Sequence, residues 1–211
     1  MMMTFALFRD VFGSAGCVSR AEILARFPQF DKNNFTRWCG KGYLVKLRNG
    51  YYAFPEYLQL PDFKYVVANK IYADSYVSLH SALIFHHYIS EQLNAQISSV
   101  TSLKTYDCRN FFGKFNYRTL RSDLLFGFEV HSAGPFTFRI ASPEKALTDL
   151  FYLFPAYYDS EQSIRNFAIE VERLFENFNV ERLYECVQKF DNQSLERRIS
   201  IFLRMYGLEA L

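Results

Sequence analysis

Residues 31–54 read DKNNFTRWCGKGYLVKLRNGYYAF. The first half of this stretch predicts a helix, because Phe35 and Trp38 have the spacing of one buried helical face and two glycines follow them. The second half places the pair Asn49-Gly50 between two runs of β-prone residues. This pair is the strongest short-range signal of a hairpin, since both residues tolerate a positive φ. The stretch therefore predicts a helix followed directly by a two-stranded hairpin.

Two shorter helices are predicted before this stretch, at residues 3–12 and 20–27. Ser19 and Glu22 have the spacing of a capping box and mark the start of the second helix. Three helices followed by a hairpin is the element order of a winged helix-turn-helix, in which the third helix enters the major groove of DNA and the hairpin tip lies over the phosphates. We therefore predict a winged helix-turn-helix DNA-binding domain at residues 1–55.

The net positive charge of the chain lies in its N-terminal part. Residues 1–60 hold eight Lys and Arg against four Asp and Glu, a net charge of +4, whereas residues 61–211 hold 16 against 18, a net charge of −2. No carboxylate occurs between Lys32 and Lys46, which favours contact with a polyanion over a face that is merely solvated or contacts protein. The side chains expected to contact base edges and phosphates are Lys32, Asn33, Thr36, Arg37 and Lys41 on the third helix and Lys46, Arg48 and Asn49 on the hairpin.

The rest of the chain is predicted as a linker at residues 56–61 and a larger domain at residues 62–211. Its strands are expected at residues 97–101, 115–120, 126–131 and 136–140. Its helices are expected at residues 62–70, after the N-caps Ser78 and Ser142, and throughout a tail at residues 160–207. The predicted fold class is thus α+β, an N-terminal winged helix-turn-helix followed by a larger mixed α+β domain that ends in helices.

The tail is expected to hold three helices. Apolar residues from Ile164 through Ala168 to Phe178 predict the first, as one helix of about four turns. A shorter helix is expected after Asn179, and a last one is expected to be capped by Ser194.

Two motifs stand out in the larger domain, YVSLHSAL at residues 76–83 and RIASPEKALTDL at residues 139–150. Together with SSVT at residues 98–101 and the predicted winged helix, they resemble the AbiEi antitoxins, the antitoxin halves of type IV bacterial abortive-infection systems. The likeness covers roughly residues 5–155. The residues that match the family motifs are Ser78, Ala82, Leu83, Ser142, Pro143, Glu144, Lys145 and Asp149.

The resemblance implies a transcriptional autorepressor that binds the promoter of its own operon. It also implies that the C-terminal domain counters a cognate nucleotidyltransferase-like toxin without a stable complex, and that the chain is not an enzyme. A net charge of +4 on one head predicts weak binding by a single copy, so two copies on an inverted repeat, as a homodimer on DNA, are the expected unit. Two alternatives stay open: a regulator whose C-terminal domain senses a small ligand in an aromatic-rich pocket, and a nuclease or nucleotide-processing domain attached to a winged helix.

Sequence motifs for catalysis or cofactors are absent. The nine glycines are scattered, so none of them forms a phosphate-binding loop, and no Gly-x-Ser-x-Gly or His-Glu-x-x-His pattern occurs. His80, His86 and His87 lie close together, but no Cys or carboxylate stands at a matching ligand spacing. We therefore predict no catalytic residue, metal or cofactor.

The residues Glu144, Lys145 and Asp149 invite comparison with a nuclease cluster. Neighbouring side chains on a helix point about 100° apart, however, so Glu144 and Lys145 do not converge. Lys145 and Asp149 have the i, i+4 spacing of a favourable ion pair, and a structural role is the favoured interpretation.

The four cysteines Cys17, Cys39, Cys108 and Cys186 have no paired spacing, so free thiols are predicted. No run of apolar residues approaches the roughly 20 that a membrane span requires. The apolar start of the chain is too short for a signal peptide, and a cytoplasmic location is predicted.

Overall fold

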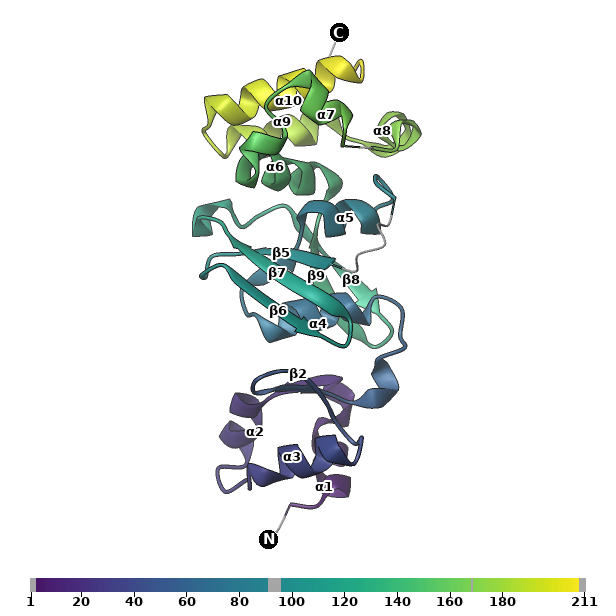
Figure 1. Cartoon of the computed structure of the whole chain (residues 1–211), viewed down its shortest axis with the longest axis vertical. Coiled ribbons are helices and arrows are strands. Elements are labelled where there is room, and N and C mark those ends of the chain that lie inside the picture. Colours follow the sequence, from purple (N-terminus) through teal and green to yellow (C-terminus); the bar gives the residue numbers. More distant parts are fainter. Residues whose placement is uncertain (1–2, 91–95, 168, 209–211) are drawn as a thin grey trace.

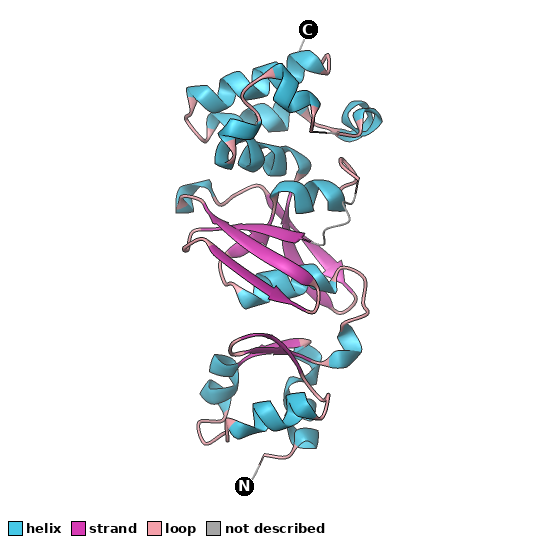
Figure 2. Cartoon of the chain, viewed as in Figure 1, coloured by secondary structure: helices cyan, strands magenta, loops and turns pink. Residues whose placement is uncertain are grey.

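The structure, a computed structural model, describes residues 3–90, 96–167 and 169–208. The fold is α+β, as predicted, and its layers are stacked along the long axis of the molecule (Figure 1). Helices and a small sheet lie at the N-terminal end, a larger sheet lies in the middle, and further helices lie at the C-terminal end (Figure 2). We call residues 3–54 the head and the described residues from 55 to 208 the body.

The head contains three helices and three strands. The helices α1 (Phe5–Phe12), α2 (Arg20–Arg26) and α3 (Asn33–Gly40) and the hairpin of β2 (Val45–Arg48) and β3 (Tyr51–Ala53) lie where the sequence predicts them. The capping box is present, since the Ser19 backbone N–H donates to Glu22 Oε2 (2.8 Å) and the Glu22 N–H donates to Ser19 Oγ (3.1 Å). The sequence did not predict β1 (Cys17–Ser19), which pairs antiparallel with β3.

Aromatic rings form most of the core of the head. Phe8 is fully buried, and its ring centre lies 4.8 Å from that of Trp38 and 5.0 Å from that of Phe12. Phe35 stacks on Tyr52 with their ring centres 4.4 Å apart, which joins α3 to the hairpin. Burial of a large apolar side chain contributes about 1.5–3 kcal/mol, so this cluster stabilises three short helices that would not form alone.

The body is built on a six-stranded sheet of order β6-β7-β5-β4-β9-β8. The pairs β5–β7 and β4–β9 are parallel and the other neighbours are antiparallel. The sequence did not predict β4, which has only three residues, or β6, whose apolar content is low. The strands are β4 (Ser75–Val77), β5 (Gln96–Thr101), β6 (Tyr106–Asn110), β7 (Gly113–Thr119), β8 (Phe128–Ala133) and β9 (Phe136–Ala141).

Helices cover the sheet on the sides that face the two ends of the molecule (Figure 1). The helix α4 (Phe63–Ile71) lies between the sheet and the head, and the Tyr117 hydroxyl donates to the Ala68 carbonyl (2.8 Å). The helices α5 (Leu79–Phe85) and α6 (Pro143–Leu153) lie toward the C-terminal end. The predicted linker at residues 56–61 overlaps a short 3-10 helix (Pro55–Tyr57), so part of it is regular structure.

The helical tail departs from the prediction first at residues 164–178. The predicted helix from residue 164 to 178 is two helices, α7 (Glu161–Arg165) and α8 (Val171–Asn177). Between them Ile169 forms an isolated bridge with Ile89, so a tertiary pairing interrupts the helical pattern. Ala168, which the prediction included, lies outside the described residues.

The remaining helices are α9 (Val180–Gln188) and α10 (Gln193–Met205), as expected. The N-cap of α10 is Asn192, whose side chain accepts from the Leu195 N–H (2.8 Å), and not Ser194. Among the described residues, no helix combines the length and apolar character needed to cross a membrane.

The head and the body share a tight contact at Gly16. Its φ is +65°, and a Cβ atom there would lie 2.6 Å from Phe136 Cζ of β9. The Lys70 ammonium of α4 also lies 2.5 Å from the Glu22 carboxylate of α2. The head is therefore packed against the body at several points.

We expect Gly16→Ala to lower the free energy of unfolding by about 1–3 kcal/mol, because it combines a left-handed backbone with overlap of the Phe136 ring. Urea denaturation of the full chain measures the change. Gly40→Ala is the matched control, because a Cβ at Gly40 would meet nothing within 4 Å. A Gly16→Ala chain as stable as the control would contradict the close contact.

Candidate nucleic-acid interface

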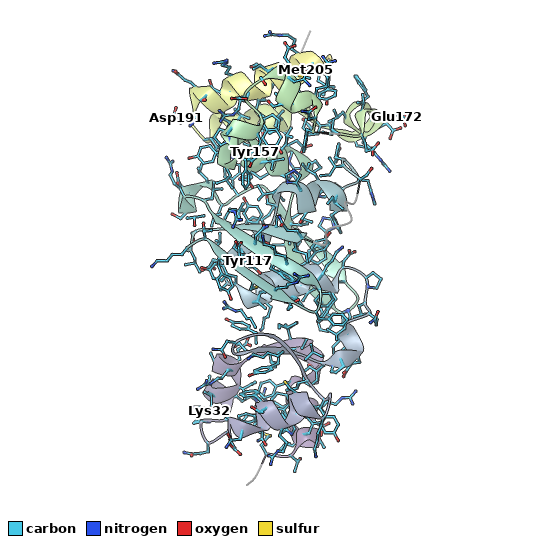
Figure 3. All side chains as sticks on the ribbon, viewed as in Figure 1. Lys32, Tyr117, Tyr157, Glu172, Asp191 and Met205 are labelled. Carbon is cyan, nitrogen blue, oxygen red and sulfur yellow. The ribbon has the colours of Figure 1, made fainter. Side chains whose placement is uncertain are left out.

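The outer face of α3 is open to solvent. The same helix buries Asn34, Phe35 and Trp38, and its other polar side chains occupy the opposite side. Figure 3 labels Lys32 in the head, toward the opposite end of the molecule from Met205. All five side chains predicted to contact DNA from this helix are exposed: Lys32, Asn33, Thr36, Arg37 and Lys41.

Local bonds position part of this face. The Arg37 guanidinium donates to the side-chain oxygen of Asn34, which is buried, so the guanidinium is held at the surface. The Asn33 N–H donates to Asp31 Oδ1 (2.9 Å) at the start of the helix. A hollow of about 490 Å³ lies beside Arg37 and is also lined by Arg26, with Asp31 as its one lining carboxylate among the described residues. The face is therefore polar and mainly basic.

The hairpin differs from the expectation. Its tip does not extend from the head, because the Gly50 carbonyl accepts from the Arg20 N–H (2.7 Å) at the start of α2. Lys46 and Asn49 are exposed, as a phosphate contact requires.

The predicted phosphate contact by Arg48 needs correction. The Arg48 guanidinium carbon lies 4.4 Å from the ring centre of Tyr51 and 5.1 Å from that of Tyr106 in β6. Cation–π attraction and partial burial thus hold this side chain between the hairpin and the body. The sequence could not indicate this contact, since β6 lies more than fifty residues later in the chain.

The family-motif residues meet in the interior of the body. Lys145 and Asp149 are fully buried and form an ion pair along α6. Asp149 Oδ2 also accepts from the Ser78 hydroxyl (2.8 Å) and from the Tyr76 hydroxyl (3.0 Å). Ser78 occupies the N-cap position of α5, as predicted, but its side chain makes no capping bond and donates to Asp149 of α6 instead.

Burial governs the electrostatics of this cluster. It raises the pKa of Asp149, and the Lys145 ammonium opposes that rise. Burial, followed by the Asp149 charge, raises the pKa of Tyr76 well above its ordinary value. The Lys145 Nζ atom lies 4.6 Å from the ring centre of Phe126 and 4.8 Å from that of Phe190. The cluster joins β4 to α6 without an opening to a substrate, which favours the structural interpretation.

The other motif residues also have packing roles. Ser142 caps α6, since its Oγ accepts from the Lys145 N–H (3.3 Å), and Pro143 occupies the first turn. Glu144 is buried and its Oε1 accepts from the Asn179 N–H (3.1 Å). It therefore takes no part in the ion pair between Lys145 and Asp149. Ala82 and Leu83 are fully buried in the core.

His80 and His86 bond different parts of the body, and the His86 ring centre lies 5.9 Å from that of His131. His80 Nε2 lies 3.3 Å from the Tyr158 hydroxyl, and His86 Nε2 lies 2.9 Å from the Ala141 carbonyl oxygen. His87 is exposed, while burial lowers the pKa of both His80 and His86. Within the described ranges, no three His, Cys, Asp or Glu side chains are placed to hold a metal ion, and all four cysteines are free.

No protein-family model matches this sequence, and no curated protein matches it. The likeness to the AbiEi antitoxins therefore stays a prediction that depends on the motifs at residues 76–83 and 139–150.

We expect the loss of either partner of the buried ion pair to destabilise the chain by about 3–5 kcal/mol, because the remaining charge would be unpaired. Lys145→Met and Asp149→Leu are the single variants, and denaturant unfolding measures each. The double variant should lose less than the sum of the two single variants, since no charge is then left in the interior, while the Tyr76 and Ser78 hydroxyls still lack their acceptor. Additive losses in the double variant would mean that the two charges do not compensate each other.

We expect the unfolding temperature to fall as the pH decreases below about 6.5, the ordinary pKa of a histidine. The pKa values of His80 and His86 are lower in the folded chain, so their contribution to stability is present above that pH and is lost as they are protonated. His86→Gln retains a donor for the Ala141 carbonyl and should weaken the pH dependence. His87→Gln, at the exposed neighbour, is the control, and an equal effect of the two would refute the assignment to His86.

Proposed function

We propose that the chain binds double-stranded DNA through the outer face of α3 and represses its own promoter. The observation that carries the proposal is the exposure of a carboxylate-free basic face on a helix at one end of the molecule. Lys32 and Lys41 flank this face nine residues apart, about 13.5 Å along a helix axis. The two lysines lie at the caps of α3, where their ammonium groups can contact backbone phosphates if the helix enters the major groove.

The side chains between these lysines have the chemistry of base readout. An arginine such as Arg37 can donate two hydrogen bonds to the O6 and N7 atoms of guanine, and an asparagine such as Asn33 can bond adenine in the same way. Thr36 can bond a base edge through its hydroxyl or contact a thymine methyl group through its own methyl group. The element order of the head, with a third helix and a hairpin, is compatible with a winged helix-turn-helix.

The proposed biological role is that of a non-enzymatic antitoxin in a type IV toxin–antitoxin system, opposing a nucleotidyltransferase-like toxin. The motif resemblance supports this part of the proposal. The burial of Lys145 and Asp149 supports a role for the motif in folding rather than in catalysis. No metal or cofactor is required by the proposal.

A second candidate function is a DNA-binding regulator that senses a small ligand. A cavity of about 550 Å³ in the body is lined by Tyr157, Tyr158, Phe167 and His80, with Glu170 at its wall. Aromatic walls with a few polar groups are typical of small-molecule sites. A ligand that raises the unfolding temperature and changes DNA affinity would favour this function over the antitoxin role.

We expect Arg37→Ala to weaken binding to the DNA upstream of the chain's own gene about 5- to 150-fold, equivalent to 1–3 kcal/mol, if Arg37 contacts a base. Lys46→Ala should weaken binding to all sequences alike and reduce the salt slope by about one unit. Arg48→Ala should leave the salt slope unchanged, because its guanidinium lies against tyrosines. Fluorescence anisotropy at several salt concentrations measures all three.

Arg197→Ala is the matched control, since Arg197 is exposed on α10 in the C-terminal part of the chain, away from α3. It removes one positive charge without touching the head. Wild-type affinity in Arg37→Ala and Lys46→Ala alike would refute DNA binding by the outer face of α3.

A further inference from the structure

The two edges of the large sheet differ in what covers them. At the β6 edge, Tyr106 packs against Arg48 of the head, so the head lies against this strand. At the β8 edge, Val130 is 66% exposed and Phe128 is 36% exposed. Strand β8 contains no lysine or proline, and its pairing with β9 has no bulge. It therefore lacks three of the features with which proteins usually block an open edge, although it carries one acidic side chain, Glu129.

The backbone of β8 is oriented for pairing with another strand. The β8–β9 hairpin closes through the two residues Gly134 and Pro135, so Ala133 and Phe136 form its first hydrogen-bonded pair. Hydrogen-bonded pairs then recur at every second residue of β8, and the Ser142 N–H, which donates to the Gly127 carbonyl (3.0 Å), continues this pattern. The outward N–H and C=O groups are thus those of Phe128, Val130 and Ser132. Within the described residues, none of these outward groups is joined to another segment.

We propose that a second copy of this chain pairs with β8, antiparallel and centred on Val130. In this register Val130 faces Val130 of the second copy, and Phe128 faces Ser132 of the second copy. The outward groups of these residues then form about six hydrogen bonds between the copies. The most exposed apolar side chain of the strand becomes buried against its own symmetry mate.

The same register brings two polar side chains that can hydrogen-bond into contact. Glu129 lies opposite His131 of the second copy, at positions that are not hydrogen-bonded and whose side chains are closest. Glu129 is held in place by Arg182 (3.1 Å) and lies 3.4 Å from His131 of its own chain. A shift of the pairing by two residues would lose both the Val130 contact and the Glu129–His131 match. Self-complementarity about one residue is what a two-fold contact requires, so we favour a second copy over a different protein.

The symmetry axis of such a pair is perpendicular to the sheet. The head, α4, the sheet and the C-terminal helices are stacked across the sheet along the long axis (Figure 1). The axis therefore runs along the stacking direction, and both heads lie at the same end of the dimer. The pairing itself does not depend on DNA binding, whereas its use on an inverted repeat rests on the proposed function.

The test is the mass of the full chain in solution without DNA, by size-exclusion chromatography with light scattering. The chain has a mass of 24.9 kDa, so a dimer of about 50 kDa is expected at micromolar concentrations. Val130→Lys should give the monomer mass, because two ammonium groups would meet at the axis. Thr137→Lys, an exposed position on β9, is the matched control and should remain dimeric.

Crosslinking tests the register. Val130→Cys should form an intermolecular disulfide on mild oxidation, since the two Cα atoms lie about 5.5 Å apart in such a pair. Ser132→Cys should not, because its symmetry mate is four residues away along the strand, about 13 Å. A monomeric wild type, a dimeric Val130→Lys or equal crosslinking at the two positions would overturn the proposal. An Arg37→Ala chain that loses DNA binding but remains dimeric separates this inference from the proposed function.

Discussion

The ion pair between Lys145 and Asp149 is the constraint on which the arrangement of the body depends. Neither group has access to water, and removal of two charges from water costs several kcal/mol for each ion. The pair survives because the Asp149 carboxylate also accepts from Tyr76 and Ser78. Those two residues flank the end of β4, so the compensation of one charge fixes how α6 lies on the sheet.

The cluster also explains why residue 127 is a glycine. Gly127 has a φ of +68°, and a Cβ atom there would lie 3.1 Å from Lys145 Cγ. The backbone at Gly127 thus packs directly against the aliphatic stem of Lys145. At the other end of the stem, Phe126 and Phe190 present ring faces to Nζ. The low-dielectric surroundings that make the charge costly also strengthen its bond to Asp149.

The sequence predicts the elements whose signals are local. The spacing of Phe35 and Trp38 places α3, and the pair Asn49-Gly50 places the hairpin, because neither signal needs a distant partner. Strand β1 has three residues, which is too short for a periodic pattern, and it forms through pairing with β3. The break between α7 and α8 was missed because the apolar spacing continues through it, while the pairing of Ile169 with Ile89 joins positions 80 residues apart.

The difference between local signals and distant contacts also separates the outer face of α3 from the hairpin in the candidate interface. The outer face of α3 was predictable because burial of one side of a helix exposes the other side. The position of Arg48 was not, because its surroundings include Tyr72 and Tyr106, which belong to the body. An arginine on a hairpin is free to reach a phosphate only if no ring of its own chain competes for the guanidinium. Here three tyrosines compete, so the residue that charge alone would assign to DNA instead helps to hold the head on the body, and the orientation of α3 depends on that contact.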